Sequence, residues 1–335
     1  VNAGNPVSLR LPPRPGTYEL RYVQSDGRQV LARMNVEVLP APATVAVPTG
    51  PAGGTATVQW TGPAYSDDWI GFYDPSDRTN HSYDAAVRVG VPADGSPAVL
   101  RYPARPGTYE IRYIMGLGRT QIASQVVEIT PVTATITTAP NGVAGALAEI
   151  GWTGPDYDGD WIGFYAPGDT TNHSYDAVTR IAVAEGNPLR LRYPPTPGIY
   201  ELRYIQSHGR VQLAAVTIEV TDVGATLTTA ASGVAGSLAE IGWTGPGNPG
   251  DWIGFYNPDN RANHAHEAIT RIAVDEGNPL QLRYPPNPGT YELRYIMSQG
   301  RTQLASQTIE VTPVTATLTT AANGVAGSLA EIGWT

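Results

Sequence analysis

The chain has 335 residues, including 37 glycines and 30 prolines, while 41% of the residues are hydrophobic. This combination of turn formers and apolar residues excludes a wholly disordered chain and predicts short ordered elements. The net charge of −9 disfavours nonspecific binding to nucleic acid, and the lack of cysteine excludes disulfides, thiol catalysis and cysteine-ligated zinc. No apolar run approaches the roughly 18 residues of a membrane span, so we expect none.

Several motifs recur at a constant interval. The motif PGTYELRY and its close variants begin at Pro15, Pro106, Pro197 and Pro288, so each copy follows the last by 91 residues. Counting each unit from its opening Ala-Thr segment gives whole units at 43–133, 134–224 and 225–315. The back part of a unit occupies 1–42, and the front part of one occupies 316–335. The sequence therefore predicts three whole modules between two partial ones.

Within each module the pattern predicts β-strands only. In the third module, β-prone runs bounded by Gly, Pro, Asn or Asp occupy residues 225–231, 238–244, 251–256, 266–274, 280–284, 290–297 and 303–311. No segment has sustained helical periodicity. Seven or eight strands in a unit of 91 residues are typical of an immunoglobulin-like β-sandwich.

Aromatic residues and glycines at fixed places favour the same fold. The PG-x-Y entry to the 290–297 strand predicts a tyrosine corner, whose hydroxyl bonds nearby backbone, at Tyr18, Tyr109, Tyr200 and Tyr291. The repeated DWIGFY strand begins where such sandwiches keep a buried tryptophan, here Trp69, Trp161 and Trp252. The next hairpin is predicted to turn at Asp26-Gly27, Leu117-Gly118, His208-Gly209 and Gln299-Gly300.

The motifs WTGP, DWIGFY, PG-x-YELRY and AS-x-x-IEVT together resemble immunoglobulin-like repeats of large secreted or surface proteins of bacteria, some of which carry von Willebrand A-type domains. The DWIG strand followed by a YxxRY strand is also similar to the SKICH domain, which has an immunoglobulin-like fold. The resemblance covers the whole chain. It implies spacer or adhesion modules without catalytic residues, at the cell surface or outside the cell.

The partial units at the two ends lack strands that a closed sandwich needs. The chain opens on Val1 without a signal-peptide pattern, so we expect a window on a longer array. Strand exchange between successive chains and disordered ends are the alternatives. Joints such as EITPVTAT at 128–135 contain no Gly/Ser tract, which predicts a rod with restricted bending.

Two polar clusters are candidate metal sites. The first is a group of closely spaced carboxylates beside a glycine, formed by Asp156, Asp158 and Asp160, which suits the oxygen-rich shell of calcium as a cofactor. A turn role for Asp160 is the alternative. The segment NHSYD at 80–84 and 172–176 becomes NHAHE at 263–267, whose two histidines suit a metal. A surface loop, with glycosylation sequons at its asparagines, is the alternative there.

Arginine forms a stripe that repeats with the module, at Arg21, Arg112, Arg203 and Arg294. Because the planar guanidinium pairs well with carboxylates, we interpret this stripe as a contact between modules or between chains. A solvated strand face is the alternative. Tyrosines near loop ends are candidate platforms for sugars: Tyr65, Tyr73 and Tyr157.

No nucleophile elbow, phosphate-binding loop, HExxH or dinucleotide fingerprint occurs, so we do not expect an enzyme. Stacked sandwiches make a rod, and identical surfaces along it would let weak contacts between copies of the chain add up. The sequence therefore predicts a structural region of an extracellular bacterial filament, fibre or stalk that self-associates. The alternative is an adhesin or carbohydrate-binding array whose loops recognise a ligand.

Overall fold

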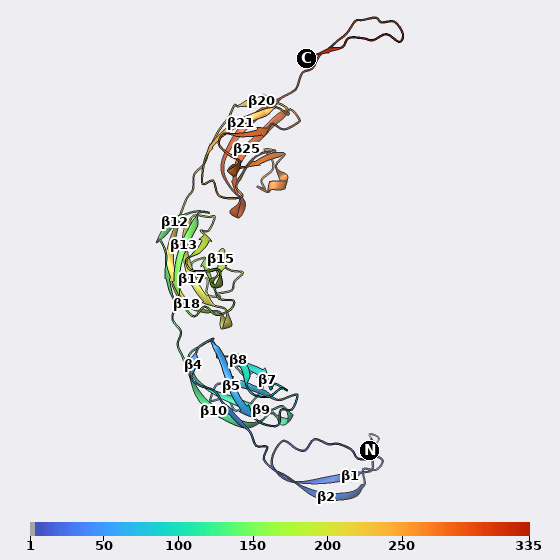
Figure 1. Ribbon diagram of the computed structural model, residues 1–335, viewed down its shortest axis with the longest axis vertical. Coiled ribbons are helices and arrows are strands. Elements are labelled where there is room, and N and C mark those ends of the chain that lie inside the picture. Colours follow the sequence, from blue (N-terminus) through green and yellow to red (C-terminus); the bar gives the residue numbers. More distant parts are fainter. Residues whose placement is uncertain (1–3) are drawn as a thin grey trace.

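The computed structural model describes residues 4–335, which form β-strands joined by loops and short 3-10 turns (Figure 1). Three β-sandwiches follow one another in a curved row, with a two-stranded hairpin at each end of the row. Over this range no helix has the length and apolarity to cross a bilayer. The predicted all-β fold of tandem immunoglobulin-like units is confirmed.

Each module contains eight strands. In the first module they are β3 (Thr44–Ala46), β4 (Gly50–Pro51), β5 (Thr55–Thr61), β6 (Trp69–Tyr73), β7 (Val87–Gly90), β8 (Ala98–Arg101), β9 (Gly107–Met115) and β10 (Thr120–Thr130). Their counterparts in the second module are β11 (Thr135–Thr137), β12 (Asn141–Val143), β13 (Leu147–Thr153), β14 (Trp161–Tyr165), β15 (Thr179–Ala182), β16 (Leu189–Arg192), β17 (Gly198–Gln206) and β18 (Val211–Thr221).

The third module repeats this order with β19 (Thr226–Thr228), β20 (Ser232–Val234), β21 (Leu238–Thr244), β22 (Trp252–Tyr256), β23 (Thr270–Ala273), β24 (Leu280–Arg283), β25 (Gly289–Met297) and β26 (Thr302–Thr312). The hairpin of the first partial unit pairs β1 (Gly16–Val23) with β2 (Val30–Val38). In the last partial unit β27 (Leu318–Thr319) pairs with β28 (Gly333–Trp334).

Every module packs a three-stranded sheet against a five-stranded one. In the first module the sheets have the orders β3-β5-β8 and β4-β10-β9-β6-β7. All pairs are antiparallel except β4 with β10, which run parallel. The opening segment is thus divided between the two sheets, with β3 in one and β4 in the other. The sequence had indicated a single opening strand.

The short second strand is rich in glycine because an aromatic ring lies against it. A Cβ added to Gly50 would lie 2.2 Å from the ring of Tyr102, and one added to Gly142 would lie 2.1 Å from the ring of Tyr193. Glycine weakens a strand signal in the sequence, although here it permits the close approach of backbone and ring.

The main core of each module lies between the two sheets. Alternation along β5 buries Ala56, Val58 and Trp60 while their neighbours face solvent. The Trp60 ring meets the Tyr113 ring edge-on, with centroids 5.7 Å apart. Ile70 and Phe72 of β6 complete this cluster from the opposite sheet.

The tryptophan that opens the DWIGFY strand lies outside this main core. Trp69 and Tyr73 form a separate cluster with Ile114, because successive side chains of β6 point to opposite faces of the sheet. Trp161 and Trp252 belong to equivalent clusters. All three tryptophans are buried as expected, but on the outer face of the five-stranded sheet and not between the sheets.

The hairpin turn lies one residue later than predicted. Positive φ angles occur at Gly118 (68°) and at Arg119 (50°), so the turn centres on Gly-Arg. The same pair of positive φ angles recurs at Gly27-Arg28, Gly209-Arg210 and Gly300-Arg301. Glycine adopts this conformation freely, whereas arginine pays about 1 kcal/mol or more for it.

Candidate functional site

A long loop covers the outer face of the five-stranded sheet in each module. In the first module residues 74–86 connect β6 to β7, and the backbone N–H of Ala86 returns to donate to the carbonyl of Phe72 at 2.8 Å. Beneath the loop, Trp69 Nε1 donates to the Tyr73 hydroxyl at 2.7 Å. The loop and these two rings form a small second core that also contains an arginine.

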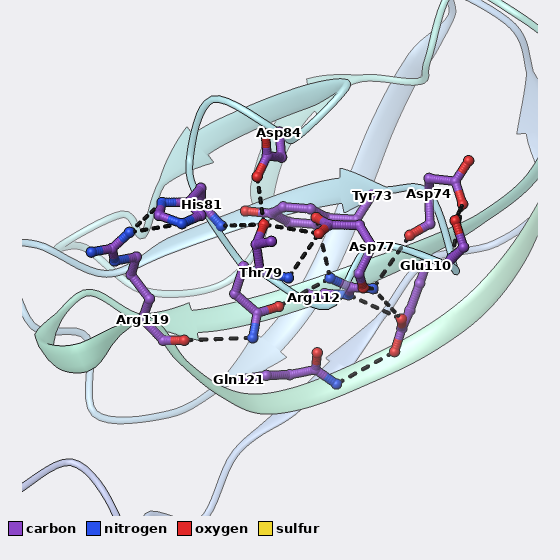
Figure 2. A network of polar contacts seen from close by, with 12 residues as sticks. Tyr73, Asp74, Asp77, Thr79, His81, Asp84, Glu110, Arg112, Arg119 and Gln121 are labelled. Atoms are coloured by element: carbon purple, nitrogen blue, oxygen red, sulfur yellow. Dashed lines mark hydrogen bonds and ion pairs between the residues drawn. The ribbon is translucent and has the colours of Figure 1, made fainter.

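That arginine is Arg112 of β9, whose side chain is 1% exposed (Figure 2). Its guanidinium lies over the Tyr73 ring, 4.7 Å from the centroid. It donates to the Glu110 carboxylate at 2.8 and 2.9 Å, to Asn80 Oδ1 at 3.0 Å and to the Asp77 carbonyl at 2.8 Å. One buried cation thus ties the covering loop to the strand below it.

The network repeats in the next two modules. Arg203 lies 4.7 Å from the Tyr165 centroid, and Arg294 lies 4.8 Å from that of Tyr256. Arg203 is bonded to Glu201, Asn172 and the Asp169 carbonyl, and Arg294 is bonded to Glu292, Asn263 and the Asn260 carbonyl.

This burial corrects the interpretation of the arginine stripe as a contact between modules or chains. Arg112, Arg203 and Arg294 are at most 3% exposed, so their guanidinium groups cannot reach another surface. Only Arg21, in the open hairpin of the first partial unit, has an exposed side chain (56%). The sequence could not distinguish a buried arginine from an exposed one, because the loop that covers the arginine lies about 35 residues away in the chain.

The buried arginine changes the acidity of its carboxylate partner. Partial burial alone would raise the pKa of Glu110, but hydrogen bonds from Ser124 and Arg112 and the Arg112 charge hold this pKa below its ordinary value. The pKa of Glu292 is lowered in the same way, against the effect of its partial burial, by Arg294 and Ser306. These carboxylates therefore remain ionised beside their arginines at neutral pH.

A buried aspartate, Asp68, fixes the loop that precedes β6. Asp68 is 2% exposed, and its carboxylate accepts from the Tyr113 hydroxyl at 3.1 Å, from Tyr65 N at 3.1 Å and from Gly116 N at 3.0 Å. It thereby links the loop before β6 to the turn after β9. Asp160 and Asp251 make the equivalent bonds in the other two modules.

This arrangement does not support the calcium site. Asp160 is buried and both of its oxygens accept from protein groups, while Asp156 and Asp158 are exposed. Within residues 4–335, no group of three or more His, Asp or Glu side chains converges as metal ligands would. The turn role, which was the alternative for Asp160, describes its contacts.

Burial also shifts the acidity of the groups around this aspartate. Burial raises the pKa of the Asp160 carboxyl, against hydrogen bonds from Ser207 and Tyr157 that lower it. Burial, together with the nearby Asp68 carboxylate, raises the pKa of Tyr113 to about 12. The pKa of Tyr295 is raised to about 12 by burial and by Asp251.

Each tyrosine expected at a corner bonds the backbone four residues earlier. The hydroxyl of Tyr109 donates to the Arg105 carbonyl at 3.3 Å, and that of Tyr200 donates to the Thr196 carbonyl at 2.9 Å. Tyr291 and Tyr18 make the same bond, at 3.0 and 2.9 Å. The bond fixes the loop that carries the contact surface between modules.

Successive modules meet directly. The linkers are short: β10 ends at Thr130 and β11 begins at Thr135, while β18 ends at Thr221 and β19 begins at Thr226. The Gly-Arg turn of each unit lies against the loop before the corner tyrosine of the preceding unit. A Cβ on the turn glycine would lie 2.8, 2.4 or 2.8 Å from the facing side chain in the pairs Gly118–Pro13, Gly209–Ala104 and Gly300–Pro195.

Buried side chains complete these joints. Gln206 and Met297 are 0% exposed, and they pack against Gly53 and Gly145 of the preceding modules. Between the second and third modules, Gln299 Nε2 donates to the Tyr193 carbonyl at 3.0 Å. The modules therefore contact one another through packed side chains in addition to the linker.

None of the three tyrosines considered for sugars is a free platform. Tyr73 is fully buried, Tyr157 lies against Gly54 at a joint, and the Tyr65 ring is covered by Arg10 at 4.2 Å. Sequence reasoning missed the exposed pairs in the covering loops. Tyr83 stacks on His81 and Tyr175 stacks on His173, and these two tyrosines are 76% and 77% exposed.

No protein-family model and no curated protein matches the sequence. Similar solved structures include extracellular domains 3–5 of Drosophila OTK (14% identity, 83% of this chain and 100% of that chain covered, TM-score 0.25). They also include invasin, a bacterial integrin-binding protein (12% identity, 84% and 62% covered, TM-score 0.22), and the BSP domain of a biofilm associated protein (7% identity, 83% and 67% covered, TM-score 0.23). These similarities concern the fold alone, and the strand pairing identifies the chain as an array of tandem immunoglobulin-like sandwiches.

Proposed function

We propose that this chain is a stiff structural segment of an extracellular or cell-surface stalk or fibre. The observation that carries the proposal is the docked joint, which occurs three times with equivalent residues. A linker of a few residues already limits bending, and packing of the Gly-Arg turn against the preceding unit removes further freedom. A chain of such joints holds its ends apart, which is the task of a stalk.

Association with further copies of the chain is part of this proposal. Repetition of one surface at every module makes weak contacts between parallel rods additive. The buried arginines do not take part in such contacts, so the contacts involve the exposed strand faces and loops. Electron microscopy of the purified chain checks this part, since lateral bundles are expected, and single rods at all concentrations would contradict it.

The joint itself is tested by Gly209→Ala. The new Cβ would lie 2.4 Å from the Ala104 side chain, at a φ of +74° that alanine tolerates poorly, so the turn must move away from the first module. We expect small-angle X-ray scattering to show a broader distribution of end-to-end distances than for the parent chain.

The matched control is Gly27→Ala, which imposes the same backbone strain at a φ of +68° but meets no atom within 4 Å. It should leave the scattering profile unchanged. If Gly209→Ala also scatters like the parent chain, or if the parent chain itself behaves as freely jointed beads, the stalk proposal is wrong.

A further inference from the structure

The exposed histidine–tyrosine pairs present fixed aromatic faces. In the first module the Tyr83 and His81 rings are stacked, with centroids 4.7 Å apart and planes inclined by 24°. The second module repeats the pair in Tyr175 and His173, at 4.6 Å and 21°. Stacking on one side leaves the other face of each tyrosine to solvent. A rigid aromatic ring binds at a lower entropy cost than a flexible side chain.

An arginine lies beside each pair. Arg119 Nη1 approaches the His81 ring, and Arg210 Nη1 lies 3.1 Å from His173 Nε2. Both arginines have positive φ angles, 50° and 51°, which side chains other than glycine rarely adopt. In the part of the chain that the structure describes, neither forms an ion pair. The same conformation occurs at Arg28 and Arg301, so it belongs to the turn that all the units share.

These features have the chemistry of a sugar site. The face of an aromatic ring attracts the weakly positive C–H groups on one side of a pyranose ring. The guanidinium, which lies beside the histidine of each pair, offers several N–H donors, and sugar hydroxyl groups accept such bonds. We propose that Tyr83 with Arg119, and Tyr175 with Arg210, form two equivalent binding sites for hexopyranose units of a glycan.

The charge of the chain favours a neutral glycan. With a net charge of −9, the protein repels a long polyanion, although a single carboxylate could approach one arginine. Two equivalent sites on one rod can engage one polysaccharide together, which raises the overall affinity above that of either site. This inference does not depend on the stalk proposal. The tyrosines lie in the covering loops, and although Arg119 and Arg210 belong to the Gly-Arg turns, the neighbouring glycines face the preceding unit at the joints.

The third module supplies an internal comparison. His266 occupies the place of the tyrosine and lies 5.0 Å from His264, with the rings inclined by 36°. A histidine ring offers a smaller and more polar face than a tyrosine ring. We therefore expect the third module to bind weakly, and we expect His266→Tyr to create a third site.

The test is a titration of the full chain with glucose, mannose and galactose hexasaccharides, and with galacturonate hexamers, followed by calorimetry. Binding of a neutral hexasaccharide is expected, with a loss of roughly tenfold or more in the Tyr83→Ala, Tyr175→Ala double variant. Tyr65→Ala is the matched control, since that ring is covered by Arg10. Because Tyr83 and Tyr175 are exposed, unfolding temperatures should change little.

Two further variants separate binding from stability. Arg119→Gly with Arg210→Gly relieves the positive φ, so the protein should unfold at a higher temperature while binding more weakly. His266→Tyr should strengthen binding of long chains. Binding of galacturonate alone would overturn the neutral assignment. Failure of every probe to bind the parent chain, or binding that the double tyrosine variant leaves unchanged, would overturn the sites themselves, whatever the scattering profile shows.

Discussion

Individual residues carry the buried polar groups that hold each covering loop. An arginine on a sheet face is ordinarily exposed, but here a tyrosine ring, a carboxylate and backbone carbonyls surround it. Removing one partner of such a buried pair is costly because the other charge remains without compensation. The partial unit at the N-terminal side keeps the same arginine and glutamate without the loop, which provides a comparison within one chain.

We therefore expect Arg112→Ala to destabilise the first module by about 3–5 kcal/mol, because Glu110 and the loop carbonyls lose their partner. Arg21→Ala removes the equivalent arginine from the open hairpin and should cost under about 1 kcal/mol. Differential scanning calorimetry of the full chain measures both. Equal effects of the two substitutions would mean that the buried network contributes no more than a surface pair.

The raised pKa of the buried tyrosines predicts an alkaline limit to stability. In the unfolded chain tyrosine ionises near pH 10, whereas Tyr113 in the folded module ionises at about 12. The stability that the protonated phenol contributes is fully present below pH 10 and is lost as pH rises to about 12. The free energy of unfolding should fall by up to about 1.4 kcal/mol per pH unit for each such tyrosine.

Urea unfolding of the full chain between pH 9 and pH 12 measures this slope. The variant Tyr113→Phe cannot ionise, so its first module should show a shallower pH dependence, although it is less stable at neutral pH without the bond to Asp68. An unchanged slope would show that other groups govern the alkaline transition.

At the scale of elements, the strands could be predicted wherever apolar and polar residues alternate or a β-prone motif repeats. The alternation in β5 and the repeated PGTYELRY segment identify strands and the corner tyrosine directly. The strand β4 could not be predicted, because it is two residues long and its glycine serves a contact with Tyr102. A short glycine-rich segment has no sequence pattern typical of a strand, and it forms a strand only because it pairs with a neighbouring one.

The second core beneath the covering loop could be predicted only in part, because its sequence also lacks a local signal for which face is covered. All five residues of β6 are buried, so its sequence does not distinguish the face between the sheets from the outer face. Only the covering loop makes Trp69 and Arg112 part of a second core, and sequence alone does not show where that loop lies. Tyr83 is an ordinary loop residue in the sequence, and its stacking on His81 becomes apparent only in the fold.

At the scale of the whole molecule, the residue that precedes the turn glycine differs between the joints. His208 lies at the joint between the first and second modules, and Gln299 takes its place at the next joint. Burial and the Arg101 charge of the preceding module lower the pKa of His208, and Arg105 and Tyr109 also line its surroundings. The docked joint therefore favours the neutral imidazole.

This difference predicts a joint that loosens in acid. Because the docked pKa is depressed, the contribution of His208 to docking is present above the ordinary value of about 6.5 and is lost as pH falls below it. Spin labels on the first and second modules should report wider distances at pH 5 than at pH 7.5. Labels across the Gln299 joint should not, and His208→Gln should abolish the response; equal behaviour of both joints would contradict the prediction.

The parallel pairing of the second and last strands of each module has a mechanical consequence. In the second module, Asn141, Gly142 and Val143 of β12 face Glu219, Val220 and Thr221 of β18, and the chain leaves the module from the end of β18. Tension along the molecule pulls β12 backward and β18 forward along a shared axis. The hydrogen bonds between them are then loaded in shear, all at once and across their length, so each sandwich resists stretching more strongly than if its strands could peel apart one bond at a time.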